Sequence, residues 1–229
     1  MSVVVRALVF DVFGTLVDWR AGIVEAFRRA GLQEDPERLA DAWRAAVWPV
    51  LDEVNKGKRG WLTFDDVHRV VLDELVAEHG LALPDETRAE LVWAWHRLDP
   101  WPDVQDGLER LRSQRIVAAL SNGNVALLVD LARHGDLRFD CLFSAEMPHV
   151  YKPAAEVYLT AARMLGLAPD EVMLVAAHPW DLTGARSAGL RTAFVDRPLE
   201  YGSGSPPRED PDADESVADL VELADSLSG

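Results

Sequence analysis

The chain has 229 residues, of which 48% are hydrophobic, and its formal net charge at pH 7 is −16. This length suffices for one α/β domain with a large insertion or for two small domains, and the hydrophobic content predicts a packed core rather than disorder. Nucleic acids and anionic membranes attract clustered positive charge, so the acidic balance argues against both as partners.

The first predicted element is a strand over Val3–Phe10, and Asp11-Val12-Phe13-Gly14-Thr15 follows it directly. A run rich in β-branched apolar residues is typical of a buried strand. A carboxylate at the carboxyl end of such a strand, before a glycine turn, lies where open α/β sheets place their ligands. Asp11 is therefore a candidate nucleophile.

Helical periodicity fills the next part of the chain, from about Trp19 to Trp95. This stretch is too long for one crossover helix, so it predicts an inserted helical cap with a return hinge at Leu98–Pro102. We expect residues 17–97 to form the cap and residues 1–16 with 98–229 to form the core. The apolar residues at helical spacing include Ile23/Phe27/Ala30, Leu39/Trp43/Ala46/Val50 and Val67/Val70/Val71/Leu75.

The rest of the chain alternates strands with helices. Such alternation predicts an α/β fold, here a Rossmann-like core with a parallel sheet and helices on both faces. Near the C-terminus, Gly202–Ser216 has the composition of an exposed loop, and Val217–Leu227 has an amphipathic helical pattern. The further predicted strands are Ile116–Leu120, Cys141–Phe143, Val172–Ala177 and Thr192–Val195, and the helices are Gly123–His134, Ala154–Leu165 and Leu182–Ala188.

Polar side chains follow four of these strands where each one ends. Asp11 follows the first, Ser121-Asn122 the second, Lys152-Pro153 the third after a short loop, and His178 to Asp181 the fourth. Each group alone could be a turn or a helix cap. Because the carboxyl ends of parallel strands meet at one edge of the sheet, the four groups together predict a site.

Lys152 is one of only three lysines in the chain, since arginine supplies nearly all the positive charge. A compact ammonium group suits pairing with a carboxylate nucleophile, so Lys152 is a candidate partner of Asp11. The alternative is a solvated lysine on the surface.

These motifs resemble the haloacid dehalogenase-like superfamily, and within it the L-2-haloacid dehalogenases (type II). The resemblance covers nearly the whole chain, and its first and last motifs are specific to the superfamily. The subfamily resemblance depends on fewer residues. The matching features are the Asp11–Thr15 loop, the helical cap, Ser121-Asn122, Lys152-Pro153 with Tyr158, and Trp180-Asp181 followed by Thr183-Gly184-Ala185-Arg186.

The resemblance implies a hydrolase that acts on carbon–halide bonds without a metal or another cofactor. Phosphatases of the superfamily carry a second aspartate two positions after the first and use Mg²⁺, whereas this chain has Phe13 there. A halide leaving group needs no proton, and an uncharged carbon needs no metal to screen it from a carboxylate. Asp11 would displace halide from a haloacetate or an L-2-halopropionate, and water would then release a 2-hydroxy acid from the Asp11 ester.

The resemblance also implies roles for individual residues. Lys152 would hold Asp11 ionised, and Asp181 would position the lysine and the water. Arg44, with Asn122, would draw off the halide, although spacing alone favours an ion pair on the helix surface. Tyr158 would support the lysine or simply pack its helix. The residues expected to bind substrate or halide are Phe13, Thr15, Arg44, Trp61, Ser121, Asn122, Tyr158 and Trp180.

One departure from the family pattern concerns ester hydrolysis. Many of these dehalogenases have a Ser-Ser-Asn run after the fourth strand, and this chain has Ala176-Ala177-His178. An imidazole titrates near neutrality, so His178 is a candidate general base with Asp18 or Asp181 as its partner. The alternative is a passive loop residue.

Two other functions stay open at this point. One is a metal-dependent phosphatase that uses Asp18 or His178 as its acid, and the other is a non-catalytic binding protein on this fold. The expected partners are a small anionic haloacid, water and halide, with no nucleic acid and no membrane, and a homodimer is expected only because relatives often form one. No apolar run reaches the roughly 18 residues of a membrane span, and the N-terminus lacks a signal peptide pattern, so we expect a cytoplasmic protein.

Overall fold

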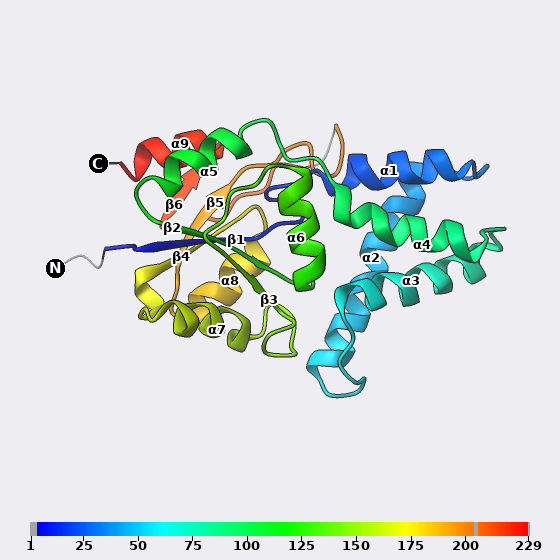
Figure 1. The fold of residues 1–229 in the computed structure, drawn as a ribbon, viewed down its shortest axis with the longest axis horizontal. Helices are drawn as coiled ribbons and strands as arrows, with labels where there is room; N and C mark the ends of the chain where they lie inside the picture. The colour runs from blue at the N-terminus through cyan, green and yellow to red at the C-terminus, as the bar shows by residue number, and fades with distance from the viewer. Residues whose placement is uncertain (1–3, 204–205, 229) are drawn as a thin grey trace.

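The computed structural model describes residues 4–203 and 206–228 (Figure 1). Six parallel strands form one sheet in the order β3-β2-β1-β4-β5-β6. The predicted α/β fold with a parallel sheet is thereby confirmed. The strands are β1 (Ala7–Phe10), β2 (Ile116–Ser121), β3 (Cys141–Ser144), β4 (Val172–Ala176), β5 (Arg191–Val195) and β6 (Glu215–Val217).

The strand ends are level at the centre of the sheet. Phe10 pairs with Ala119 of β2 and with Val175 of β4, so the residues after these strands leave the sheet at one edge. Every residue of β1 and β4 is buried, because helices cover both faces of the sheet. Figure 1 shows α5 (Val104–Arg112) and α9 (Leu220–Ser226) together on one face, and α7 (Ala155–Leu165) and α8 (Pro179–Ser187) on the other.

Four helices pack together to one side of the sheet, within the range predicted for the cap (Figure 1). Their ends carry the expected signals: Asp18 and Asp35 cap two N-termini, and Thr63 with Asp66 forms a capping box. The boundaries at residues 17 and 97 stay a prediction. The helices are α1 (Trp19–Ala30), α2 (Pro36–Asn55), α3 (Phe64–His79) and α4 (Asp85–Ala94), followed by a short 3₁₀ helix η1 (Trp95–Arg97).

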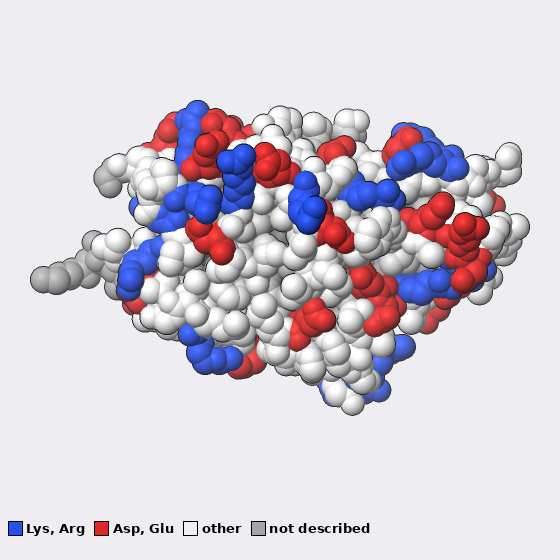
Figure 2. Space-filling model, in the orientation of Figure 1, with Lys and Arg blue, Asp and Glu red and all other residues white. Residues whose placement is uncertain are grey.

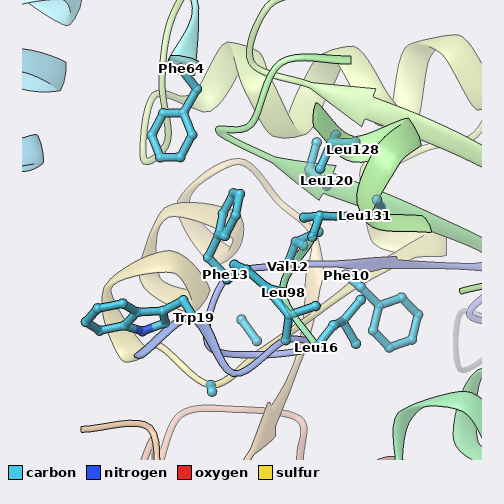
Figure 3. Close-up of a cluster of buried hydrophobic side chains, with 14 of the residues drawn as sticks. Phe10, Val12, Phe13, Leu16, Trp19, Phe64, Leu98, Leu120, Leu128 and Leu131 are labelled. Carbon is cyan, nitrogen blue, oxygen red and sulfur yellow. The ribbon is translucent and has the colours of Figure 1, made fainter. Parts of the chain in front are cut away.

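A buried apolar cluster joins the two parts of the molecule around the loop after β1. Val12 and Leu16 pack with core leucines, while the ring of Phe13 lies toward Phe64 of α3 (Figure 3), with 5.4 Å between ring centroids. The loop that carries Asp11 is therefore fixed by packing on both sides.

The structure differs from the sequence predictions in several elements. The first strand begins at Ala7, since Val4 is 70% exposed beyond the sheet, and Val3 lies outside the described residues. Helix α5 was not predicted. The predicted C-terminal loop contains β6, and the last helix begins at Leu220 instead of Val217; residues 204 and 205 of that loop lie outside the described residues.

Charged groups of both signs lie interspersed on the face shown in Figure 2. Several charged residues form ion pairs, such as Arg112 with Asp140 and Arg110 with Asp106. In the part of the chain that the structure describes, no helix combines the length and the apolar character needed to cross a membrane.

Candidate active site

Asp11 is held by three hydrogen-bond donors at the end of β1. Lys152 Nζ lies 3.2 Å from Oδ1, and Oδ2 accepts from Thr15 Oγ1 at 2.8 Å and faces His178 Nδ1 at 3.0 Å. Burial by itself would raise the pKa of Asp11, but Lys152, His178 and Thr15 together hold it below the ordinary range. The carboxylate is therefore ionised and oriented, as a nucleophile must be.

Lys152 is buried between two carboxylates, with 1% of its side chain exposed. Its ammonium group lies 2.7 Å from Asp181 Oδ2 in addition to the Asp11 contact, and Tyr158 donates its hydroxyl to Asp181 Oδ1 at 2.6 Å. Burial would lower the pKa of Lys152, but the two aspartates raise it above the ordinary value. The alternative of a solvated surface lysine is wrong.

His178 lies between Asp11 and Glu200. Its Nδ1 is 3.0 Å from Asp11 Oδ2, and its Nε2 is 3.0 Å from Glu200 Oε1. Two carboxylates thus face the two ring nitrogens, so both nitrogens donate and the ring is an imidazolium. Burial would lower the pKa of His178, but Glu200 and Asp11 raise it to about 9. The predicted partners Asp18 and Asp181 are wrong, because Asp18 caps α1 and Asp181 binds Lys152.

A small cavity of about 10 Å³ lies beside Asp11 at the junction of the cap helices and the core. A cavity of roughly 10–15 Å³ holds one water molecule, so this one is too small for a haloacid. In this structure the cavity has room for about one water molecule. The cavity is lined by Asp11, Phe13, Arg44, Val47, Trp48, Leu51, Phe64, Asn122 and Trp180.

Arg44 of α2 faces this cavity from the side opposite the core. Its guanidinium lies 5.5 Å from the Trp19 ring and about 6 Å from the rings of Phe13, Trp48 and Trp95. It forms no ion pair with a described residue, and its buried Nε has no hydrogen-bond partner among them. The alternative of a surface ion pair is wrong. A cation with an unused donor in an aromatic cage is suited to hold an anion.

The sequence and the structure were compared with those of known proteins. A family model described as haloacid dehalogenase-like hydrolase matches residues 5–189. The chain belongs to this family. The predicted resemblance is thereby confirmed, and the match covers strands β1 to β4 and the cap helices of this haloacid dehalogenase-like hydrolase.

Several relatives are similar over nearly their full length. An (S)-2-haloacid dehalogenase from Pseudomonas sp. (strain YL) is 30% identical over 84% of this chain and 83% of its own. Among solved structures, the L-2-haloacid dehalogenase PA0810 is 45% identical with a TM-score of 0.93, covering 97% of this chain and 98% of its own. An L-2-haloacid dehalogenase from Xanthobacter autotrophicus with chloropropionic acid covalently bound is 26% identical with a TM-score of 0.85, covering 98% of this chain and 99% of its own.

The other predicted residues of this haloacid dehalogenase-like hydrolase fall into two groups. Asn122 and Trp180 line the cavity, and Asn122 Oδ1 also accepts from the Lys152 backbone N–H at 2.8 Å. Thr15 and Ser121 are buried beside the site without lining the cavity. Thr15 accepts from the Ala177 N–H at 3.0 Å, and Ser121 accepts from the Gly123 N–H at 3.1 Å.

Trp61 does not reach the cavity. The Trp61 ring stacks on the rings of His149 and Tyr151, with 5.1 and 4.8 Å between ring centroids. Trp48 and Phe64 line the cavity with aromatic rings instead. The prediction that Trp61 lines the halide cradle is therefore wrong. Phe64 directly begins α3, three residues after Trp61, so a nearby aromatic takes the position.

Glu200 is the site residue that sequence reasoning missed. It follows β5 in a loop, is fully buried, and accepts from Trp19 Nε1 at 3.0 Å as well as facing His178. Glu200 lies five residues beyond the end of β5, and no sequence pattern marks it as a site residue. Among the described residues, no group of three or more His, Cys, Asp or Glu side chains could hold a metal ion.

Proposed function

We propose that this protein is a hydrolytic dehalogenase that converts short L-2-haloacids and haloacetate to 2-hydroxy acids through an Asp11 ester. The observation that carries the proposal is the cavity between Asp11 and Arg44. An ionised carboxylate lies on one side of it and a buried cation with an unused donor on the other. This polarity suits a reaction in which negative charge moves from a nucleophile to a leaving anion.

In the first step, Asp11 attacks C2 of the haloacid and halide leaves toward Arg44 and Asn122. Lys152 and Thr15 keep the attacking carboxylate ionised and oriented, which reduces the entropy that the reaction must lose. Backbone amides near Phe13 bind the substrate carboxylate. Ser121, which is buried beside the cavity, stays a predicted substrate-binding residue. The chloropropionic acid covalently bound in the Xanthobacter autotrophicus enzyme supports a covalent intermediate in this reaction.

In the second step, water attacks the carbonyl carbon of the Asp11 ester and releases the 2-hydroxy acid. His178 accepts the proton of this water, and Lys152 and Asp181 hold the ester and the water in place. Asp11 returns as a carboxylate.

A phosphatase needs an acid two residues after its nucleophile, and here Phe13 fills that position. The Phe13 ring packs 5.4 Å from Phe64 and 5.7 Å from Trp95, measured between centroids. The substitute acids considered from the sequence are also committed elsewhere, since Asp18 caps a helix and His178 binds two carboxylates. A non-catalytic protein would not need the buried charges around Asp11, which cost free energy to desolvate.

The test is halide release from a panel of fluoro-, chloro- and bromoacids with EDTA present. We expect turnover that EDTA leaves unchanged and that Asp11→Asn lowers by about 10³-fold or more. Asp212→Asn, the same substitution at an exposed position, is the control. Loss of activity in EDTA with a preference for p-nitrophenyl phosphate would identify a phosphatase, and equal halide release by wild type and Asp11→Asn would identify a non-catalytic protein.

We further propose that the small haloacid, water and halide are the only partners of the site. The homodimer and the cytoplasmic location expected from the sequence stay predictions.

A further inference from the structure

Glu200 lies on the side of the His178 ring opposite Asp11, and other side chains hold it there. Its carboxylate is fully buried: Oε1 faces His178 Nε2 and accepts from Trp19 Nε1, each at 3.0 Å, and Oε2 forms an ion pair with Arg208 NH2 at 2.6 Å. A buried carboxylate is costly unless it is paired and hydrogen-bonded in this way. His178, Arg208 and Trp19 hold the pKa of Glu200 down at about 2 against the effect of burial, so it is an anion.

The nucleophile loop makes room for this carboxylate. Gly14 has φ of 87°, and a Cβ built on it would collide with Glu200 Oε1. Only glycine therefore allows the loop to turn so close to the acid. Glu200 thus touches the loop that carries Asp11 and the histidine that binds Asp11, although it lies 189 residues further along the chain than Asp11 (200 − 11).

The charge on His178 must differ between the two steps of the proposed reaction. In the resting protein it faces two carboxylates, Asp11 and Glu200, which are the charged groups in contact with its ring among the described residues. An imidazolium cannot accept a proton from water. After Asp11 becomes an ester its charge is gone, and His178 faces a single carboxylate, Glu200.

We propose that Glu200 is a positioning residue that turns His178 from the cationic partner of Asp11 in the first step into the general base of the second. This inference depends on the dehalogenase function proposed above. Glu200 fixes Nε2 as the protonated nitrogen, so the proton that leaves the ring leaves from Nδ1. The free Nδ1 then points at the ester that water attacks.

The protons balance over the cycle. In the first step the Asp11–carbon bond forms, the carbon–halogen bond breaks and halide leaves with the electron pair. His178 then releases its Nδ1 proton to solvent. In the second step water adds to the ester carbonyl carbon and gives one proton to Nδ1. The bond between that carbon and the ester oxygen then breaks, and the remaining water proton passes to the departing alkoxide, which leaves as the 2-hydroxy acid. The imidazolium and the Asp11 carboxylate are thereby restored. The net products are the 2-hydroxy acid, halide and the one proton that His178 released.

The test separates the two steps in Glu200→Gln, which keeps the size and an acceptor but removes the charge. With enzyme in excess, rapid quench measures halide release, and mass spectrometry measures the Asp11 ester. We expect halide release within about threefold of wild type, ester hydrolysis slower by about 10²-fold, and accumulation of the ester. Glu209→Gln is the matched control, because Glu209 is an exposed acid of the same loop and should leave both steps unchanged.

A double-mutant cycle tests whether Glu200 acts through His178. In a His178→Asn background, Glu200→Gln should slow ester hydrolysis no further. A large additional effect would overturn the inference, and so would ester hydrolysis at the wild-type rate in Glu200→Gln. If wild type forms no ester at all, the proposed function fails instead, so the two failures are distinguishable.

A titration keeps the inference testable if Glu200→Gln does not fold. NMR of ¹⁵N-labelled histidine should show a charged His178 at pH 7 in wild type. In Asp11→Asn, which removes the Asp11 charge as the ester does, the pKa of His178 should fall. A neutral His178 in wild type, or an unchanged pKa of His178 in Asp11→Asn, would overturn the proposed change of His178 from cation to general base.

Discussion

At the scale of single residues, the site is a chain of buried charges that satisfy one another. Glu200, His178, Asp11, Lys152 and Asp181 alternate in sign, with each contact between 2.7 and 3.2 Å. Buried charges are tolerated when each one is paired, so loss of one member leaves its neighbours uncompensated.

Lys152→Met is therefore expected to be severe. It would leave Asp181 without a cation and Asp11 with His178 alone, so we expect a loss of about 3–5 kcal/mol in the free energy of unfolding and of nearly all halide release. Lys56→Met is the control: Lys56 forms an exposed pair with Asp52 and should cost about 0.5 kcal/mol or less. Urea denaturation measures both. Equal stability of the two variants would contradict the buried network.

The raised pKa of His178 predicts how stability depends on pH. Because the folded pKa is about 9 and the unfolded value about 6.5, the ion pairs of His178 contribute fully below pH 6.5 and are lost as the pH rises through 9. We expect wild type to lose roughly 3 kcal/mol of unfolding free energy over this window. His178→Asn should lack that part of the loss, as denaturation at several pH values would show.

The residues of this network could be predicted unevenly from the sequence. Asp11, Lys152, His178 and Asp181 follow strands whose ends converge, so their proximity follows from the topology of a parallel sheet. Glu200 lies five residues after β5, and no local pattern indicates that its loop folds back onto Gly14. The partner of His178 was therefore missed, because only tertiary contacts determine it.

At the scale of elements, long periodic helices and buried strands were predictable, and short elements formed by tertiary contact were not. Strand β6 has three residues, two of them polar, and exists because it pairs with the edge of β5. There, Asp214 accepts from the Thr192 N–H through its side chain and donates its own N–H to the Thr192 carbonyl. Aspartate and proline are uncommon in strands, so the composition of this segment predicts a loop and gives no indication of β6.

Contacts between elements also tie the cap helices to the core. His96 of η1 lies 3.1 Å from Asp65 of α3 and 2.8 Å from Asp130 of α6 (Val125–His134). Burial would lower the pKa of His96, but the two aspartates raise it above its ordinary value. The ion pairs of His96 with Asp65 and Asp130 therefore contribute fully to stability below about pH 6.5, and this contribution is lost as the pH rises through the raised pKa of His96.

His96→Gln is expected to lower the free energy of unfolding by about 1–2 kcal/mol at pH 6, with a smaller difference at high pH. Denaturation of wild type and variant at both pH values checks this. His134→Gln is the control, since His134 pairs with an exposed aspartate, Asp99, and should change little. A difference that grows with pH would show that His96 is not charged in the folded protein.

At the scale of the whole molecule, the cap helices close over the nucleophile and leave a cavity smaller than the proposed substrates. Trp48 of α2 packs edge-on against Trp180 of α8, with 4.7 Å between centroids, and so forms one wall across the junction. The wall predicts a preference for the shortest haloacids.

Trp48→Ala should relax that preference. We expect the ratio of kcat/KM for 2-chlorobutanoate to that for chloroacetate to rise by about tenfold, since a methylene in an apolar pocket changes the barrier by about 1–3 kcal/mol. Trp93→Ala is the control, because Trp93 is 45% exposed and does not line the cavity. An unchanged ratio in Trp48→Ala would show that another wall limits substrate size.

The central claim is that Asp11 forms an ester with the substrate carbon, and a single turnover in H₂¹⁸O tests it most directly. With enzyme in excess, the oxygen joined to C2 comes from Asp11, so the account predicts an unlabelled 2-hydroxy acid and ¹⁸O in the Asp11 carboxylate. Mass spectrometry of the product and of the peptide that contains Asp11 measures both. Label in the first-turnover product with none in Asp11 would mean that water attacks the substrate directly, and would contradict the account.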